Sequence, residues 1–262
     1  MSRTVKPKKG SLVIIGGSED KENGAEILKE VVRLGGGGKL VVASVASEIS
    51  DELWESYRKV FQRLGVKKIA HLAIDRPDEA QLSKVINILD GARTVFFTGG
   101  DQLKITTKIG GTRVAERLFE IFSAGGVIAG TSAGASIMGE NMLIGGAGKE
   151  SHKVGNWMMA PGMGLLKETI IDQHFAQRGR IGRLLGAIAL NPRVLGIGID
   201  ENTAIVVRGG KFKVCGSNAV YVIDGHHVSY TNISEAEADR TMSMHDVRLH
   251  VLSAGEHFDL AS

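Results

Sequence analysis

The sequence has a single cysteine and no long apolar run, and both shortages narrow the kind of protein it encodes. Cys215 has no second cysteine with which to form an internal disulfide, and the alternating pattern around it is typical of a small packed residue in a strand. A chain without disulfides fits a reducing compartment. The apolar run at residues 12–15 is too short for a signal peptide, and no stretch approaches the ~20 apolar residues of a membrane span. We therefore expect a soluble, cytoplasmic protein without a membrane partner.

Net charge is also in short supply. The formal charge is +3 on 262 residues, and the basic residues are spread along the chain rather than gathered in a run with interleaved aromatics. A nucleic-acid-binding protein usually carries such a basic patch, so we expect no nucleic acid among the partners. Residues 1–10 are basic and are expected to form a flexible N-terminus.

What the sequence does contain is apolar residues (43%) and 35 glycines, about twice the ordinary usage of glycine. The glycines show no collagen-like period, so they indicate tight turns and close approaches of the backbone. No linker, internal repeat or low-complexity segment divides the chain. We expect one domain over residues 1–262, with a sizeable core.

The first half of the chain alternates short apolar runs with longer segments of helical character. The runs predict strands over residues 12–15, 40–45, 68–73, 94–98 and 127–129. The longer segments predict helices over 25–34, 51–64, 77–89 and 112–124, with Ser50 or Asp51 as the N-cap of the second helix. Strands without polar alternation, separated by helices, indicate an α/β fold in which helices sandwich a mostly parallel sheet.

The second half has a different pattern. Residues 140–164 are rich in glycine and methionine and are expected to form a loop, followed by a strand at 165–171 and a helix at 178–190. Shorter runs separated by Asn, Asp and Gly then predict strands over 195–199, 204–207, 211–214, 219–223, 227–230 and 248–252. We expect these C-terminal strands to extend the parallel sheet with an antiparallel part.

The end of the fifth predicted strand is the most informative segment. It runs into Gly130-Thr131-Ser132-Ala133-Gly134, which fits the pattern G-x-S-x-G. That pattern is typical of a sharp strand-to-helix turn that exposes a nucleophilic serine at its tip, although an ordinary glycine-rich turn is the alternative. Ser132 is the candidate nucleophile. The oxyanion hole would use the N–H of Ala133 and a second N–H from Gly99 or Gly100.

A serine nucleophile needs a base, and the base needs an orienting acid. Among the eight histidines, His174 is the candidate base because it follows the end of an apolar run, where sites form in parallel sheets. The predicted strand at 195–199 runs into Asp200 and Glu201. Alternation places these two carboxylates on opposite faces of the chain, so at most one points at His174. This pattern favours neither of them.

Five polar or charged residues surround His174 in the sequence: Asp172, Gln173, Arg178, Arg180 and Arg183. Arginine binds carboxylates with two parallel hydrogen bonds, so the cluster indicates a pocket for carboxylates. A solvated helix face is the alternative. No spacing of His, Cys or carboxylate residues suggests a structural zinc site, and we expect no metal or other cofactor.

Five segments, in this order, carry a resemblance to a known family: Gly16-Gly17-Ser18-Glu19-Asp20-Lys21, Thr98-Gly99-Gly100-Asp101-Gln102-Leu103, Gly130-Thr131-Ser132-Ala133-Gly134-Ala135, Asp172-Gln173-His174-Phe175 and Gly198-Ile199-Asp200-Glu201-Asn202. They resemble the cyanophycinases, serine peptidases similar to dipeptidase E with a fold like class I glutamine amidotransferases. The resemblance runs from about residue 12 to about residue 252. The segment 140–164 is the part that matches least.

The resemblance implies Ser132 as nucleophile, His174 as base and Glu201 as orienting acid. It also implies Gly99 and Ala133 as oxyanion donors. The implied pocket residues are Gln102, Asp172, Gln173, Arg178, Arg180 and Arg183.

The family hydrolyses cyanophycin, a poly-aspartate with arginine attached to each β-carboxyl, to β-aspartyl-arginine, and its enzymes are dimers without a metal. The arginines would hold substrate carboxylates, and Asp172, Glu19 or Asp20 would meet the guanidinium. The alternatives are a dipeptidase E-like enzyme that cuts α-aspartyl dipeptides and a non-catalytic binding protein on an amidotransferase-like fold.

Overall fold

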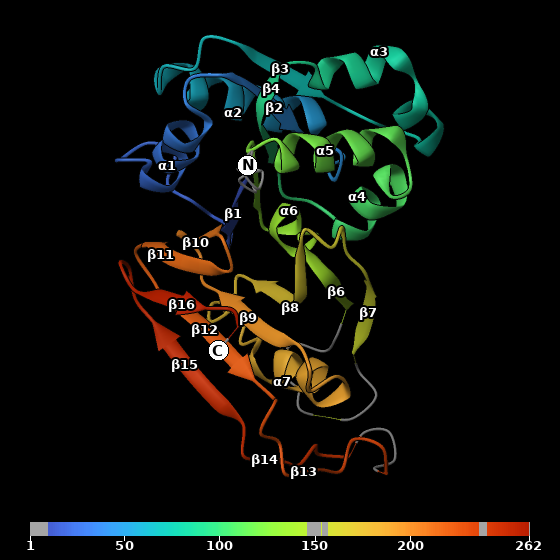
Figure 1. Cartoon of the computed structure of the whole chain (residues 1–262), viewed down its shortest axis with the longest axis vertical. Helices are drawn as coiled ribbons and strands as arrows, with labels where there is room; N and C mark the ends of the chain where they lie inside the picture. Colours follow the sequence, from blue (N-terminus) through green and yellow to red (C-terminus); the bar gives the residue numbers. More distant parts are fainter. Residues whose placement is uncertain (1–9, 146–152, 154–156, 236–239, 262) are drawn as a thin grey trace, which may run out of the picture.

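Two β-sheets flanked by helices make up most of the described part of the protein (Figure 1). The structure is a computed structural model that describes residues 10–145, 153, 157–235 and 240–261. Residues 1–9 of the expected flexible N-terminus lie outside this part, whereas Gly10 is buried and its N–H donates to the carbonyl of Phe122 (2.8 Å). Within the described residues, no helix has the length and apolar character needed to cross a membrane.

The main sheet has eight strands. They are β1 (Ser11–Ile15), β2 (Lys39–Ala43), β3 (Ile69–Leu72), β4 (Ala92–Phe97), β5 (Val127–Thr131), β10 (Thr203–Arg208), β11 (Lys211–Gly216) and β16 (His257–Asp259). Their order is β16-β11-β10-β1-β5-β4-β2-β3. The strands from β1 to β3 in this order pair in parallel, and β10, β11 and β16 continue the sheet antiparallel. The predicted α/β class and the antiparallel extension are confirmed.

The remaining strands form a second sheet, which the sequence patterns did not predict. They are β6 (Gly139–Gly145), β7 (Met158–Pro161), β8 (Leu166–Gln173), β9 (Leu195–Ile199), β12 (Val220–Asp224) and β15 (Arg248–Leu252), in the order β15-β12-β9-β8-β6-β7. The pair β13 (Tyr230–Thr231) and β14 (Met244–His245) stands apart, so the strand expected at 227–230 begins only at its end.

The prediction of a loop over 140–164 was wrong at both ends, where β6 and β7 pair antiparallel. Buried Met142 packs with the main core, whereas buried Leu143 packs with the cluster under the second sheet. The glycines of this segment mask this alternation in the sequence. Residues 146–152 and 154–156 of the expected loop lie outside the described residues.

The helices are α1 (Glu26–Gly35), α2 (Ser50–Arg63), α3 (Ser83–Ile86), α4 (Gln102–Ile109), α5 (Arg113–Ser123), α6 (Ala133–Ser136) and α7 (Ile181–Leu190). The helices differ from expectation at four places, and two of the differences have a local cause. The segment 77–89 is two 3₁₀ helices around α3, because Leu82 is extended. Ile49 is the N-cap of α2, since the Ser50 hydroxyl bonds that of Ser44 instead. α4 was missed, and α7 begins three residues later than predicted.

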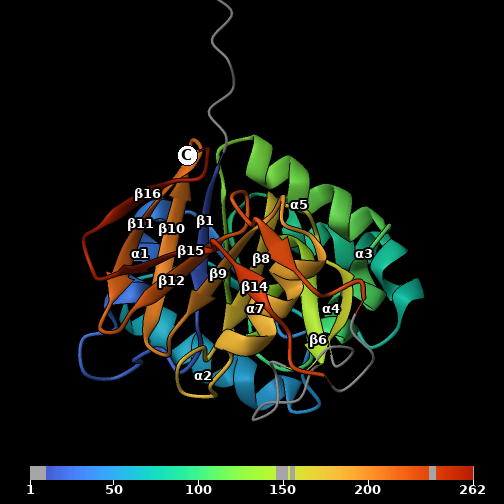
Figure 2. The same ribbon diagram turned by 90° about the horizontal axis from the view of Figure 1, so that it is seen from below.

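The packing explains why the strands are apolar on both faces. Val13 and Ile15 of β1 pack with α1 and α2, while Leu12 and Ile14 face α4, α5 and the second sheet. The short α6 contacts β5 of the main sheet and β8 of the second. Seen from below, α7 lies in front of the second sheet, on its outer side (Figure 2).

The chain crosses between the two sheets at two of the segments that the sequence indicated as functional. Ser132 lies between β5 and α6, which leads into β6, and residues 200–202 join β9 to β10. His174 follows β8 directly. The carboxyl ends of strands from both sheets therefore meet at this junction, which positions the candidate site.

Candidate active site

Three successive carbonyls at the end of β1 anchor the candidate site. Each accepts a backbone N–H from a different segment of the chain: Ser132 to Ile15 (3.0 Å), His174 to Gly16 (2.7 Å) and Asn202 to Gly17 (2.8 Å). The sequence indicated a glycine-rich turn after β1 but not this role. Because the parallel pairing sets Ile15 beside Thr131, the next residues of the two strands are already neighbours.

Ser132 has the backbone conformation expected of the elbow. Its φ is 53° and its ψ is −114°, a region that residues other than glycine rarely occupy. Such conformations persist only where the surroundings impose them and are concentrated at functional sites. The buried Ala133 and Gly134 that follow leave room for the sharp turn. The predicted strand-to-helix turn is therefore present.

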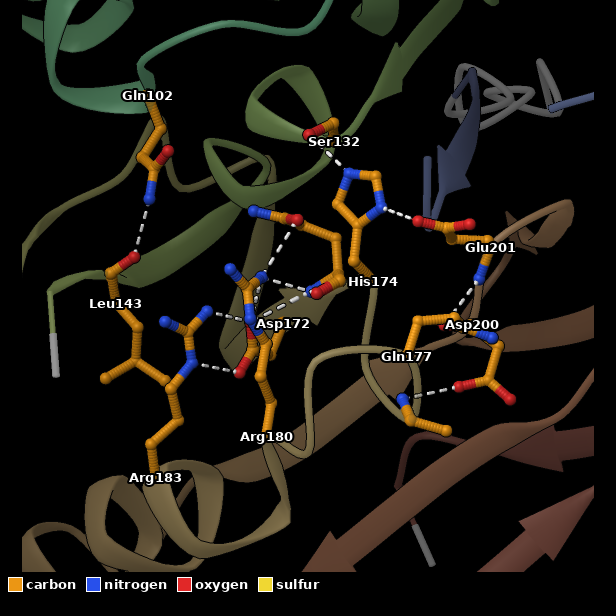
Figure 3. Close-up of polar contacts among 12 residues, drawn as sticks. Gln102, Ser132, Leu143, Asp172, His174, Gln177, Arg180, Arg183, Asp200 and Glu201 are labelled. Atoms are coloured by element: carbon orange, nitrogen blue, oxygen red, sulfur yellow. Dashed lines mark hydrogen bonds and ion pairs between the residues drawn. The ribbon is translucent and has the colours of Figure 1, made fainter. Parts of the chain in front are cut away.

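His174 lies between Ser132 and Glu201 and bonds both (Figure 3). Its Nε2 is 3.0 Å from the Ser132 hydroxyl oxygen, and its Nδ1 is 2.6 Å from Oε1 of Glu201. The imidazole also rests against Gly17, where a Cβ atom would come within 2.3 Å of the ring. Serine, histidine and glutamate thus form a hydrogen-bonded chain of the kind that activates a nucleophile.

The choice between Asp200 and Glu201 is decided by backbone donors elsewhere. Buried Asp200 accepts the N–H groups of Ala176 (2.9 Å) and Ala219 (3.3 Å), so its carboxyl group faces the interior of the second sheet. Glu201 faces His174, as alternation along the chain allows.

The surroundings keep His174 in the form that a base requires. Burial lowers its pKa below the ordinary value, and the charges of Arg178 and Arg180 lower it further, while the hydrogen bond that Nδ1 donates to Glu201 acts in the opposite direction. The hydrogen bond to His174 in turn lowers the pKa of Glu201. At neutral pH the imidazole is therefore neutral beside an ionised carboxylate.

Backbone N–H groups lie beside the serine. Ala133 is the first residue of α6, and the first N–H groups of a helix have no acceptor within the helix. Gly99 lies next to Ser132: a Cβ atom added to Gly99 would be 3.5 Å from the Cβ atom of the serine. Both positions suit donors to an oxygen that becomes negative during attack on a carbonyl.

The cluster around His174 is an internal ion network rather than a row of free charges. Asp172, 1% exposed, accepts two hydrogen bonds from the guanidinium of Arg183, one of them 2.7 Å long, and one from Arg180 (3.2 Å) (Figure 3). Arg180 also donates to the side chain of Gln173 (2.9 Å). Burial lowers the pKa of Arg180 to about 10. The expectation that Asp172 meets a substrate guanidinium is therefore corrected, since Arg183 and Arg180 already bind it.

The other expected partners of a guanidinium are likewise engaged. The Glu19 carboxyl group is buried and accepts the hydroxyls of Thr131 (2.5 Å) and Tyr57. The carboxylate of Asp20 accepts N–H groups of its own loop, from Glu22 to Ala25.

Two pocket candidates remain more open. Arg178 is exposed and, in the described part of the chain, has no hydrogen-bonded acceptor, yet its charge reaches His174. Gln102 lies at the start of α4 and donates to the carbonyl of Leu143 (2.7 Å). Within the described residues, no cluster of His, Cys and carboxylate side chains has the arrangement of a metal site.

Sequence reasoning missed the buried role of Glu19. Its two oxygens connect Tyr57 of α2 to Thr131, the residue directly before the nucleophile. The only local signal is an acid placed four residues beyond the end of β1, and its partners lie 38 and 112 residues away.

Comparison with known sequences identifies the family of the chain. The pattern of Peptidase family S51 matches residues 12–215. The chain belongs to peptidase family S51. It is 37% identical to a cyanophycinase of Trichormus variabilis over 262 residues, covering 98% of this chain and 88% of the relative. It is 34% identical to a cyanophycinase of Geminocystis herdmanii over 255 residues, covering 96% and 94%. The resemblance inferred from the motifs is confirmed.

Solved structures share the fold of this S51 member. A peptidase from an acI-B1 actinobacterium superposes with a TM-score of 0.73 at 22% identity, covering 97% of this chain and 98% of the other. A putative peptidase E protein from Listeria monocytogenes gives 0.53 at 17% identity, covering 79% and 98%. The likeness to glutamine amidotransferases stays an expectation.

The pH dependence of activity should report the environment of His174. Because the neutral imidazole is the active form, kcat/KM should fall as the pH drops through a pKa below the ordinary value of about 6.5. Arg178→Gln removes a charge that lowers this pKa, so the acid limb should move to higher pH. Arg178→Lys keeps the charge and serves as the control. An acid limb that stays in place in the Gln variant would remove Arg178 from the electrostatics of His174.

Loss of the Glu19 carboxyl group should destabilise the fold. Glu19→Ala leaves the hydroxyls of Thr131 and Tyr57 buried without their acceptor, at roughly 1–3 kcal/mol each. Urea unfolding measures the loss, and Glu22→Ala, an exposed acid of the same loop, is the control. Equal free energies of unfolding for both variants would show that Glu19 does not support the elbow.

Proposed function

We propose that this chain is a serine peptidase that hydrolyses cyanophycin to β-aspartyl-arginine. The observation that carries the proposal is the hydrogen-bonded chain of Ser132, His174 and Glu201 in a strained elbow. The substrate comes from the relatives, which are named cyanophycinases and match nearly the whole chain.

The chemistry begins with attack of the Ser132 hydroxyl oxygen on the scissile carbonyl. His174 takes the hydroxyl proton on Nε2, and Glu201 stabilises the resulting imidazolium. The N–H groups of Ala133 and Gly99 stabilise the oxyanion. The proton then passes from His174 to the departing amine, which leaves an acyl-enzyme. Water, deprotonated by the same imidazole, releases the acid product and restores the serine.

Four of the pocket candidates are assigned to direct contact with substrate: Gln102, Gln173, Arg178 and Arg180. Arg178 has no hydrogen-bonded acceptor in the described part of the chain, so its charge can bind a carboxylate of the polymer. The Arg180 side chain is 11% exposed and already bonds Asp172, so only its exposed edge can add to that contact. Asp172 and Arg183 are buried together and support this wall by holding Arg180. The pocket thus combines one free cation with a fixed internal network.

A dipeptidase E-like enzyme is the main alternative. The relative named as a putative peptidase E shares the fold, but it covers only 79% of this chain at 17% identity, which says nothing of a common substrate. A binding protein without catalysis is disfavoured by the positive φ of Ser132, because such strain has no use where the serine does not react.

The dimer rests on the resemblance alone, and the location rests on features of the sequence. We propose a homodimer in the cytoplasm, consistent with the lack of disulfide partners for Cys215. A single domain and the absence of any metal requirement stay predictions. Light scattering of the purified protein tests the dimer, and activity in the presence of a chelator tests the metal.

Ser132→Ala should abolish hydrolysis and leave the fold intact. The hydroxyl lies at a turn, so its removal opens no core cavity, while loss of a nucleophile costs on the order of 10⁴–10⁶ in rate. Mass analysis of the products after digestion of cyanophycin, beside α-aspartyl dipeptides, identifies the substrate. Wild-type protein should release β-aspartyl-arginine. Efficient cleavage of the dipeptides without attack on cyanophycin would contradict the proposal and favour the dipeptidase.

A further inference from the structure

A second hollow lies beside the nucleophile, separate from the cluster around Asp172. It has a volume of about 290 Å³, and its walls include Ser132, Gly99, Ser18, Lys21, Ile49 and Tyr57. Ser132 and Gly99 are the wall where the oxyanion forms. The opposite wall comes from the loop after β1 and from α2. The substrate contacts proposed above do not include the wall formed by Lys21, Ile49 and Tyr57.

The hollow exposes one charged group. Two ionisable acid or base groups besides tyrosine line it, Glu19 and Lys21. Both oxygens of Glu19 already accept hydroxyls, from Tyr57 and Thr131, and the residue is 5% exposed. In the described part of the chain, Lys21 forms no ion pair, and its ammonium group lies 4.3 Å from the centroid of the Tyr57 ring. Because Glu19 is almost fully buried, the charge that the hollow exposes to a ligand is the Lys21 ammonium group.

Lys21 is also held in place before any ligand arrives. Its carbonyl accepts a hydrogen bond from the Arg63 guanidinium of α2, and the Asp20 carboxylate ties down the following N–H groups. The Tyr57 ring beneath the ammonium is 3% exposed and fixed by its bond to Glu19. A preorganised cation loses little freedom on binding, which favours its use as a recognition group.

We infer that this hollow is a subsite in which Lys21 binds a carboxylate of the substrate. This inference rests on the proposed function. Each unit of cyanophycin offers a carboxylate and a guanidinium, and the free cation selects the carboxylate. Ser132 and Gly99 line the hollow, whereas His174, which protonates the leaving amine, is not among its lining residues. The unit in the subsite is therefore the one that acylates Ser132.

The subsite divides recognition between two sides of the nucleophile. Arg178 and Arg180 contact the unit that leaves, near His174, and Lys21 contacts the unit whose carbonyl acylates Ser132. The free product should accordingly bind the enzyme through its arginine carboxylate.

The test is competitive inhibition of cyanophycin hydrolysis by β-aspartyl-arginine and by its arginine carboxamide. Wild-type protein should bind the acid more tightly than the amide. Lys21→Met keeps the aliphatic stem on Tyr57 but removes the charge, so the inhibition constant of the acid should rise about tenfold or more, with that of the amide unchanged. Lys21→Arg should keep the preference for the acid.

Lys59→Met is the matched control. Lys59 lies on α2 in the neighbouring hollow, which also contains Lys21 but not Ser132. This variant also removes a lysine charge from the same surface. Both compounds should inhibit it with the same constants as they inhibit the wild type. Labelling of Ser132 by a neutral sulfonyl fluoride shows that each variant retains a folded site.

The outcomes separate the two proposals. If wild-type protein hydrolyses cyanophycin and Lys21→Met keeps the preference for the acid, the subsite is refuted and the function stands. An equal loss for acid and amide would also refute the subsite, because it indicates a structural role for Lys21. If wild-type protein does not attack cyanophycin, the proposed function and the subsite built on it both fail.

Discussion

The end of β1 is the constraint on which the candidate site depends. The carbonyls of residues 15–17 accept N–H groups from three segments that are distant in the sequence. Two of these segments, at Ser132 and Asn202, cross between the two sheets, and the third follows β8 of the second sheet. Each bond fixes the backbone of one functional segment, and together they set the geometry of the side chains. The positive φ of Ser132, which costs of order 1–3 kcal/mol, is sustained by this framework and by Glu19 beneath it.

The two-sheet architecture separates buried charged groups that hold the backbone from charged side chains that stay accessible. Buried Asp200 accepts backbone N–H groups and buried Asp172 accepts arginine side chains, so these carboxyl groups keep backbone segments and arginines in place. Half-buried or exposed groups, Arg178 on one side of the serine and Lys21 on the other, keep their charges available. Family membership in S51 is consistent with this arrangement, since peptide hydrolysis needs a rigid nucleophile and an accessible carbonyl.

Local patterns were sufficient for much of the fold and for the centre of the site. Ser132 and His174 could be predicted because each follows an apolar strand, and the elbow pattern is contained within five residues. The rest depends on contacts that no local pattern shows. Asp200 and Glu201 are distinguished by the N–H groups of Ala176 and Ala219. Likewise, the second sheet depends on pairings such as β6 with β8.

The reaction of Ser132 with a sulfonyl fluoride in a Gly17→Ala variant tests the central claim most directly. A Cβ at Gly17 would meet the His174 ring at 2.3 Å, whereas one at Gly65 has no atom within 4 Å, and both glycines have positive φ (106° and 89°). Gly65→Ala therefore controls for backbone strain. We expect the Gly17→Ala variant to fold, and its Ser132 to react with the sulfonyl fluoride about 10²-fold more slowly, because displacing a base by about 1 Å has a cost of this order. Equal labelling rates in the two variants would contradict the claim that the end of β1 assembles the site.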